Sequence, residues 1–485
     1  MTTEKKRRIE FGDFQTPDDL ANQLCTYLHQ LGLRPDVVIE PTCGVGAFVL
    51  AAARAFPEAE EVRGIDINGS YLDRLQERLA AEPVTPKVRL DQADFFSTDW
   101  QSITQALEGH LLILGNLPWV TSSTQGAIGG TNLPEKTNFL GFNGFEAMTG
   151  KANFDISEWM LLDMFRWLSG RRGDVAMLVK TAVARKVLAH AERQGEPVVN
   201  ALIVEIDAKK HFGAFVDACL LVIQLDPQAT PSYDYTILKS VDDTGGRRVG
   251  HRQGLTISDL DAFSACSFLV GQSPQKWRSG VKHDASGVME FTRVPGGYEN
   301  GLGEIADLED QYLFPLLKGS DIGSNKDWRS KFVLVTQRTV GQDTAPIRVI
   351  APKTWAYLEA HATQLDGRGS SIYAKNPRFS IFGIGDYAFR PWRIAICGLY
   401  KALRFRLVGP IEGRPVMFDD TVYFLSFDTE EEARNVLNLL QSPQATSLLS
   451  SLIFWDEKRP IKTSILNSLD WSRFGDSDQT QMTLL

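Results

Sequence analysis

A regular alternation of strand-like and helix-like segments between Asp36 and Asp226 constrains the fold of this chain more than any other feature. Short runs rich in β-branched and aliphatic residues are separated by segments with apolar residues at helical spacing. Such alternation builds a mostly parallel sheet covered by helices, and several runs are apolar on both faces, as central strands are. We therefore predict a doubly wound α/β domain. The predicted strands are Asp36–Glu40, Val62–Ile67, Val88–Asp94, Leu111–Asn116, Asp174–Lys180, Ala201–Asp207 and Ala218–Asp226, and the predicted helices are Gly46–Ala55, Ser70–Ala80 and Ser157–Ser169.

The sequence pattern changes after Asp226, where stretches rich in turn residues interrupt the alternation. A chain of 485 residues is long enough for two or three domains. We place a boundary near residue 240, so that residues 1–240 form the first domain and residues 241–485 a second, α+β domain. The second domain is predicted to contain strands at Phe332–Val335, Arg393–Ile396 and Val422–Leu425 and helices at Glu430–Leu440 and Gln444–Ile453.

The cysteines, histidines and apolar runs exclude several classes of protein. The five cysteines form no CxxC pair and the seven histidines show no HxxxH or HxH spacing, so we expect no disulfide framework and no metal site. No window approaches the roughly 18–20 apolar residues of a membrane span, and the basic run Lys5–Arg8 precedes no apolar stretch. We expect a cytoplasmic protein without a membrane partner.

A glycine-rich turn follows the first predicted strand directly and opens the first predicted helix. Gly44 and Gly46 in this turn let the backbone approach a ligand, and Asp66, at the end of the second strand, could accept both hydroxyl protons of a ribose. The third glycine of a dinucleotide fingerprint would fall at Val49, and Glu40 before the turn would repel a diphosphate. Glu40 would not repel an ammonium or sulfonium group, and S-adenosylmethionine is a nucleoside ligand with both.

Asp94 and Phe95 end the third predicted strand, where they could hydrogen-bond an adenine amine and pack on its ring. A lone GxG after a strand is usually only a tight turn. Here, however, acidic residues and glycines fall at the ends of three successive strands, and ligands of open α/β sheets bind at those ends.

The fourth predicted strand delivers Asn116, Leu117, Pro118 and Trp119 to the same edge of the sheet. The side-chain oxygen of Asn116 and the backbone carbonyl of Leu117 could hold the two N–H groups of an exocyclic amine and bias its nitrogen towards a nucleophilic geometry. Pro118 stiffens the turn, and Trp119 offers a face on which a base could stack. The plainer alternative is a turn that closes a strand, with Trp119 in the core.

These motifs resemble those of a known family. The segments FGDFQTP, VIEPTCGVGAF, RGIDIN, DQADFF and ILGNLPWV resemble, in this order, motifs X, I, II, III and IV of the gamma-class DNA adenine-N6 methyltransferases of restriction-modification systems. GDVAMLVKT resembles their motif VI and HFGAFVDACLLVIQL their motif VIII, while YLFPLLKGSDI and FSIFGIGDYAFRPWRIAI resemble segments of their target-recognition region. The resemblance implies a Rossmann-like S-adenosylmethionine-dependent methyltransferase domain followed by a target-recognition domain, with double-stranded DNA as partner.

The resemblance also implies roles for individual residues. Gln15, Thr16 and Pro17 would hold the methionine end of S-adenosylmethionine. Asn116 and Leu117 would orient the target amine of an adenine extruded from the duplex. The remaining cofactor-binding residues would be Glu40, Thr42, Cys43, Gly44, Gly46, Asp66, Ile67, Asp94, Phe95 and Asn116, and the base would stack between Trp119 and Phe212, with Phe215 as the next choice.

The fourth motif departs from the usual Asn-Pro-Pro-Tyr, because Leu117 replaces the first proline and Trp119 the tyrosine. The carbonyl acceptor and an aromatic face are kept, and one fixed φ angle is lost. Two alternatives remain open at this point: a catalytically silent DNA-binding or specificity component, and a methyltransferase acting on a protein glutamine amide.

A basic window lies in the second domain although the chain as a whole has a net charge of −9. Seven basic residues and one acidic residue fall between Ser371 and Arg406, interleaved with aromatic residues. This composition suits contact with DNA, and the alternative is a core strand pair with a solvated face. The predicted DNA-binding residues are Lys375, Arg378, Arg390 and Arg393.

Two further expectations concern partners and a loop. The polar, glycine-rich segment Thr121–Gly150 follows the fourth motif and is either a lid or DNA contact or a plain surface excursion. A cognate restriction endonuclease or the subunits of a larger defence system are the protein partners that the family resemblance suggests.

Overall fold

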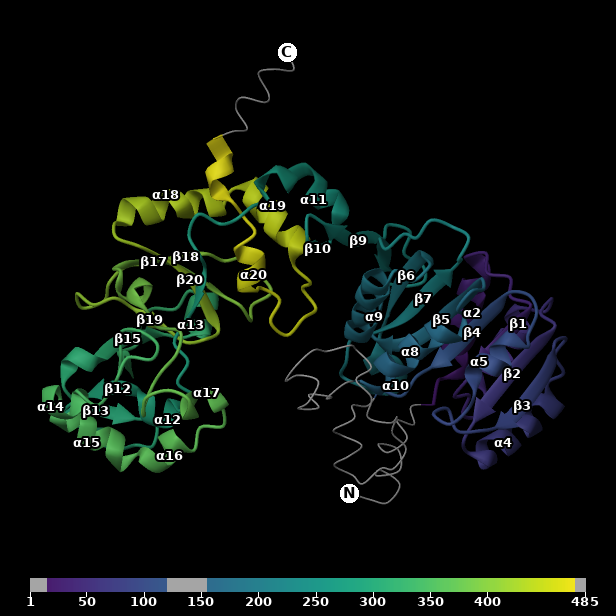
Figure 1. The fold of residues 1–485 in the computed structure, drawn as a ribbon, viewed down its shortest axis with the longest axis horizontal. Coiled ribbons are helices and arrows are strands. Elements are labelled where there is room, and N and C mark those ends of the chain that lie inside the picture. The colour runs from purple at the N-terminus through teal and green to yellow at the C-terminus, as the bar shows by residue number, and fades with distance from the viewer. Residues whose placement is uncertain (1–14, 120–154, 476–485) are drawn as a thin grey trace, which may run out of the picture. The chain divides into compact units, whose positions relative to one another are not determined.

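Two compact units make up the chain, residues 1–256 and residues 257–485. The computed structural model describes residues 15–119 and 155–475 (Figure 1). Within these residues, no helix is both long and apolar enough to cross a membrane.

A ten-stranded sheet is the centre of the first unit, in the order β10-β9-β8-β6-β7-β5-β4-β1-β2-β3. The five strands from β3 to β5 are parallel, and β7 inserts antiparallel between β5 and β6. The strands are β1 (Val37–Glu40), β2 (Glu61–Asp66), β3 (Lys87–Gln92), β4 (Leu111–Asn116), β5 (Gly173–Lys180), β6 (Val198–Ile206), β7 (Ala218–Leu225), β8 (Tyr235–Leu238), β9 (Arg247–Arg252) and β10 (Leu255–Ile257).

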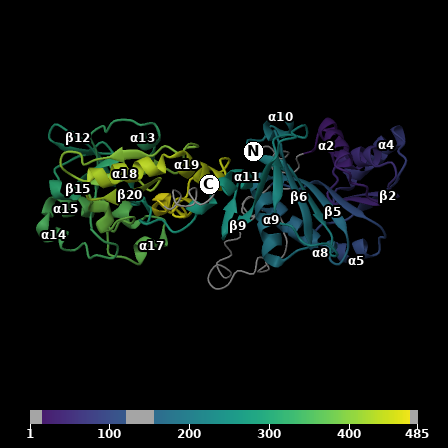
Figure 2. The same cartoon turned by 90° about the horizontal axis from the view of Figure 1, so that it is seen from above.

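Helices cover both faces of this sheet, as Figure 2 shows for α2 and α4 on one side and α5 and α8 on the other. Apolar side chains of α2, α3 and α4 share one core with alternate residues of β4 and β5, whereas α5, α8 and α9 pack on one another. The helices are α2 (Asp18–Gln30), α3 (Ala47–Ala55), α4 (Gly69–Ala81), α5 (Trp100–Gln105), α8 (Ile156–Trp167), α9 (Thr181–Gln194) and α10 (Ala208–Phe212).

The predicted doubly wound α/β fold is confirmed, and each predicted strand and helix of this part has its counterpart in the structure. The first unit extends beyond the boundary expected near residue 240, because β9 pairs with β8 and continues the sheet. The turn-rich sequence after Asp226 connects strands of the same sheet instead of separating two units.

The second unit is α+β and contains two sheets, with the strand orders β14-β13-β12-β16-β15-β19 and β11-β20-β17-β18. Its strands are β11 (Arg278–Ser279), β12 (Glu290–Val294), β13 (Gly297–Asn300), β14 (Ile305–Ala306), β15 (Leu313–Leu317), β16 (Lys331–Leu334), β17 (Trp392–Cys397), β18 (Arg406–Val408), β19 (Met417–Phe418) and β20 (Val422–Phe427). Its α-helices are α11 (Leu260–Cys266), α12 (Ser286–Met289), α13 (Gly319–Gly323), α14 (Ile347–Ile350), α15 (Pro352–Ala360), α16 (Ala362–Asp366), α17 (Ser371–Ala374), α18 (Glu430–Leu440), α19 (Pro443–Leu452) and α20 (Thr463–Leu466), and its 3₁₀ helices are η1 (Ser267–Leu269), η2 (Asp310–Tyr312), η3 (Asp386–Phe389) and η4 (Trp471–Gly475).

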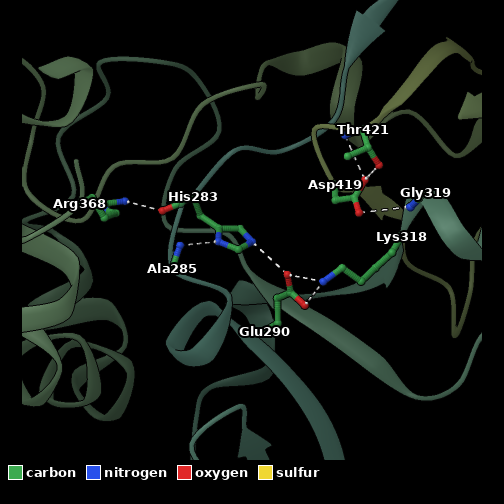
Figure 3. A network of polar contacts seen from close by, with 8 residues as sticks. All are labelled: His283, Ala285, Glu290, Lys318, Gly319, Arg368, Asp419 and Thr421. Carbon is green, nitrogen blue, oxygen red and sulfur yellow. Dashed lines mark hydrogen bonds and ion pairs between the residues drawn. The ribbon is translucent and has the colours of Figure 1, made fainter. Parts of the chain in front are cut away.

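A partly buried ion pair connects the start of β12 to the residue that follows β15 (Figure 3). Lys318 Nζ lies 3.0 and 2.8 Å from the two carboxylate oxygens of Glu290.

His283 lies on the other side of the same carboxylate (Figure 3). The Ala285 N–H donates to Nδ1 of His283 at 3.2 Å. Because a backbone N–H can only donate, Nδ1 is the unprotonated nitrogen, and Nε2 is left to face Glu290 at 3.5 Å.

The same region connects the two sheets of the second unit. Asp419, in the turn between β19 and β20, accepts hydrogen bonds from the Gly319 N–H at 3.2 Å and from the Thr421 N–H at 3.1 Å (Figure 3). A Cβ on Gly319 would lie 2.2 Å from Thr421 Oγ1, so the close approach requires glycine. The segment YLFPLLKGSDI, which resembles a target-recognition segment, therefore has a structural role at this junction.

Candidate cofactor and substrate site

The glycine-rich turn after β1 is shaped by side chains of its own unit. Gly44 and Gly46 have φ angles of 52° and 82°, in the left-handed region that favours glycine. A Cβ on Gly46 would lie 2.2 Å from Cδ1 of Leu75 in α4, and a Cβ on Gly44 would lie 2.7 Å from Oε1 of Gln15. Close packing of α4 thus accounts for Gly46 without any ligand. At Gly44 the exposed Gln15 side chain can move aside, so the positive φ angle is the reason for glycine there.

Asp66 ends β2 beside this turn, as predicted. Its Oδ2 accepts the Gly44 N–H at 2.7 Å and its Oδ1 accepts the Asn68 N–H at 2.8 Å. Each carboxylate oxygen has a second lone pair, so the oriented carboxylate can also accept the hydroxyl protons of a ribose. The neighbouring Ile67 side chain is 43% exposed and offers an apolar surface next to that position.

Glu40 is the most unusual charged group at this edge. Its side chain is only 3% exposed, and Oε2 has no hydrogen-bond partner among the described residues. Burial raises the pKa of the Glu40 carboxyl well above its ordinary value, a hydrogen bond from the backbone of Val49 opposes this, and the charge of Asp66 raises the pKa further. A buried carboxylate with an unpaired oxygen is costly unless a cation meets it, so this position fits a ligand with a positive charge.

Two other predicted residues of this edge have structural roles. The Cys43 N–H donates to the Ile65 carbonyl oxygen at 2.8 Å, and burial raises the pKa of the Cys43 thiol, which leaves it unreactive at neutral pH. Asp94 Oδ1 accepts the Phe96 N–H at 3.1 Å and so turns the chain after β3.

The ring of Phe95 does not lie open for an adenine, contrary to expectation. Phe95 is buried, and its ring centroid lies 5.3 to 6.4 Å from those of Phe96, Trp100, Trp159 and Trp167. An aromatic ring gains more by burial among other rings than by partial exposure. The half-buried neighbour Phe96 is the more accessible ring of the pair, and the FF doublet did not reveal which of the two would be buried.

The turn after β4 brings three predicted segments together. Asn116 Nδ2 donates to Thr16 Oγ1 at 3.2 Å, which orients the amide, and Thr42 Oγ1 donates to the Asn116 carbonyl oxygen at 3.5 Å. The Val45 N–H donates to Gln15 Oε1 at 3.3 Å, and the Leu117 N–H donates to the Leu178 carbonyl oxygen at 3.3 Å. The segment before α2, the glycine-rich turn and the Asn116 turn therefore meet at the carboxyl ends of the parallel strands.

Trp119 and Phe212 lie against each other instead of forming an open slot. Their ring centroids are 4.9 Å apart with an interplanar angle of 68°, and Trp119 Nε1 donates to the Leu178 carbonyl oxygen at 3.4 Å. A base would have to separate these two rings in order to lie between them. Phe212, and not Phe215, meets Trp119, while Phe215 is 85% exposed with Lys209 Nζ 5.2 Å from its ring centroid.

The predicted basic residues of the second unit differ in their surroundings. Arg393 is fully buried and donates to the Ala388 carbonyl oxygen at 2.7 Å, and burial together with the charge of Arg390 lowers its pKa to about 9. The prediction that Arg393 contacts DNA is therefore wrong, because β17 is a central strand and residue 393 points into the core. Arg378 pairs with Asp366 at 2.7 Å, while Lys375 is exposed.

The segment Thr121–Gly150 lies outside the described residues. Among the described residues, no group of three or more His, Cys, Asp or Glu side chains could hold a metal ion.

The arrangement combines a strand-turn-helix nucleoside site, a buried acid suited to a cation, and an Asn116 turn at the same edge of a doubly wound sheet. This fold and site define an S-adenosylmethionine-dependent methyltransferase.

Comparisons with known proteins agree with this class. No family model matches the chain. The chain is 48% identical over 471 residues to the type II methyltransferase M.NspV of Nostoc sp. (strain ATCC 29411 / PCC 7524), a match that covers 96% of this chain and 97% of M.NspV. The chain therefore belongs to the type II methyltransferases of restriction-modification systems. S-adenosylmethionine is its methyl donor.

One solved restriction-modification enzyme supports the fold. The type IIL restriction-modification enzyme MmeI, solved in complex with DNA, matches with a TM-score of 0.52 at 12% identity. That match covers 96% of this chain and 65% of the MmeI chain, so this chain spans about two thirds of MmeI. The M protein of the type I restriction enzyme EcoKI matches at 15% identity over 46% of this chain, with a TM-score of 0.31.

Proposed function

We propose that this protein is a site-specific DNA methyltransferase that modifies the exocyclic N6 amine of an adenine in double-stranded DNA. The observation that carries the proposal is the Asn116 turn, which lies at the same sheet edge as Glu40 and Asp66 and is held there by Thr16 and Thr42. Membership of the type II methyltransferases supports DNA as the substrate. The ordered resemblance to the adenine-N6 class supports adenine as the target base.

The described residues fit S-adenosylmethionine, which supplies an electrophilic methyl group on a sulfonium centre. Glu40 would face the positive end of the cofactor, because its Oε2 is buried and has no hydrogen-bond partner among the described residues. Asp66 would accept the ribose hydroxyls through the oxygens that the Gly44 and Asn68 N–H groups already orient. Ile67, Asp94 and the residues Gln15–Pro17 complete the proposed cofactor site.

Asn116 and Leu117 would act on the target amine by position and electrostatics. The Asn116 side-chain oxygen and the Leu117 carbonyl oxygen accept the two N–H groups, which draws the nitrogen lone pair out of conjugation with the ring. S-adenosylmethionine, when bound, would supply the methyl group to this nitrogen, and the surplus proton of the amine would leave to solvent. The two carbonyl dipoles stabilise the positive charge that develops on the nitrogen.

Trp119 and Phe212 would separate to admit the base. Their edge-to-face contact covers the buried Trp119 and part of Phe212, and stacking on a flipped base would replace that contact. Base flipping costs a few kcal/mol of unstacking, and the aromatic contacts with the base offset part of this cost.

The test is incubation of the full chain with S-adenosylmethionine and unmethylated DNA, followed by digestion and quantification of modified nucleosides. N6-methyladenine is the expected product. Formation of N4-methylcytosine would instead identify cytosine as the target base. Cofactor binding without any modified base would favour a silent specificity component, and a methylated glutamine in added protein would favour the amide substrate.

A cognate endonuclease is the protein partner that we propose, and the cytoplasm is the compartment where both proteins would meet DNA.

A further inference from the structure

Three arginines gather around the short helix η3 in the second unit. Arg278, in β11, lies with Cζ 4.8 Å from the ring centroid of Tyr387, and Arg338 lies with Cζ 4.0 Å from that of Phe389. Arg390 follows η3 directly in the chain. All three arginines are exposed.

The helix that carries these contacts is fixed from within the unit. Phe389 packs edge to face on Phe314 with ring centroids 5.5 Å apart, and Tyr387 contacts Phe424 with centroids 6.0 Å apart. The buried Arg393 donates to the Ala388 carbonyl oxygen at 2.7 Å. The buried Arg393 thus anchors the backbone of η3, and Arg278 and Arg338 lie on its aromatic side chains.

The guanidinium groups of Arg278 and Arg338 are positioned but not neutralised. Among the described residues, no carboxylate lies within ion-pair distance of either group. A guanidinium stacked on a ring keeps its N–H groups directed outward in its own plane, where they suit bidentate contact with a phosphate. By contrast, Arg378 is held by Asp366 at 2.7 Å and Arg434 is held by Glu430.

We propose that Arg278, Arg338 and Arg390 form a phosphate-contacting strip through which the second unit binds the DNA backbone. This inference rests on the proposed function and adds residues that the basic window in the sequence does not contain, since Arg278 and Arg338 lie outside it. Phosphate contacts fix the register and orientation of a protein on DNA without reading bases. The strip therefore positions the duplex, and base reading falls to other side chains.

Two acidic groups belong to the surroundings of the strip. Asp386 is the first residue of η3 and is exposed, and Asp428 Oδ1 lies 3.7 Å from Arg390 Nε. Both carboxylates oppose the approach of phosphate. Neutralising Asp386 should consequently raise the affinity for DNA, an effect that a purely structural role of η3 does not predict.

The test is the salt dependence of duplex binding by the full chain. The variants R278A and R338A should each reduce the slope of log K against log salt by about 0.9, the value for one phosphate contact on B-DNA. The variant R390A should reduce the slope by less, because Asp428 Oδ1 lies 3.7 Å from Arg390 Nε. The conservative variant R278K should keep most of the slope, because it keeps the charge. The matched controls R378A and R434A should keep the wild-type slope, because those arginines are already paired with acids.

The outcomes separate the strip from the proposed function. Wild-type slopes in all three strip variants, with a wild-type protein that binds and methylates DNA, would overturn the strip alone. A wild-type protein that neither binds nor methylates duplex DNA would overturn both. A wild-type thermal midpoint and unchanged S-adenosylmethionine affinity in each variant establish that a loss of slope reflects the removed charge.

Discussion

The substitution Gly46→Ala tests the packing that shapes the cofactor turn. Gly46 has a φ angle of 82°, which costs an alanine about 1–2 kcal/mol. The new Cβ would lie 2.2 Å from Cδ1 and 2.5 Å from Cδ2 of Leu75, which has no exposed surface to move into. Overpacking of this kind costs a further 1–3 kcal/mol or so. We therefore expect a loss of about 2–5 kcal/mol in the free energy of unfolding.

Urea denaturation of the full chain measures this loss, and Gly195→Ala is the matched control. Gly195 has a φ angle of 70° and no atom within 4 Å of its Cβ position, so this variant reports backbone strain without a clash. The double variant Gly46→Ala, Leu75→Ala removes the clash. Its loss in the free energy of unfolding should therefore be smaller, by more than about 1 kcal/mol, than the sum of the losses of the two single variants. The reasoning would be refuted if Gly46→Ala and Gly195→Ala lost equal amounts of unfolding free energy and if the losses of Gly46→Ala and Leu75→Ala simply added in the double variant.

Three further substitutions test other parts of the structure. Glu40→Gln should raise the thermal midpoint at pH 7, because the raised pKa of Glu40 means that its ionisation destabilises the folded state at any pH above the ordinary carboxyl pKa. The same variant should bind S-adenosylmethionine more weakly, as measured by calorimetry. An unchanged affinity would show that Glu40 is not part of the cofactor site. Lys318→Met should cost about 1–3 kcal/mol in urea denaturation at pH 7. Burial raises the pKa of Glu290, but hydrogen bonds from His283 and Lys318 and the charge of Lys318 lower it overall, so the cost should shrink as the pH falls below about 4.5, and a cost independent of pH would contradict this ion pair. Phe212→Ala should reduce methyl transfer while leaving S-adenosylmethionine affinity unchanged, and full activity would show that this ring does not stack on the base.

The sequence predicted the architecture of the first unit well because central strands and covering helices have different periods of hydrophobicity. β4 was predicted with its observed bounds, Leu111–Asn116, and α18 with its bounds, Glu430–Leu440. The residues at the carboxyl ends of the strands could be predicted together because parallel strands end at one edge. The unit boundary was less predictable, since three of the six residues of β9 are arginine and the strand pairs in spite of this composition.

Side-chain direction was the part that the sequence could not supply. Arg393 lies in a window with other arginines, yet the pleat of β17 turns it into the core while Arg390 remains exposed. Phe95 and Phe96 are adjacent and chemically identical, and only the packing of Trp100 and Trp167 decides which ring is buried. Arg278 and Arg338 carried no motif. The proximity of Arg278 to η3 depends on the long-range pairing of β11 with β20, and Arg338 meets Phe389 from a distant part of the sequence.

The variant Asn116→Ala tests the central claim most directly when methyl transfer and cofactor affinity are measured on the same preparation. Because the proposed role of the Asn116 side chain is to hold the target amine, and the proposed cofactor site is formed mainly by Glu40 and Asp66, we predict that N6-methyladenine formation falls by at least about 100-fold. The S-adenosylmethionine affinity should remain within a few-fold of that of the wild-type protein. Full methylation by Asn116→Ala would contradict the proposed role of this turn.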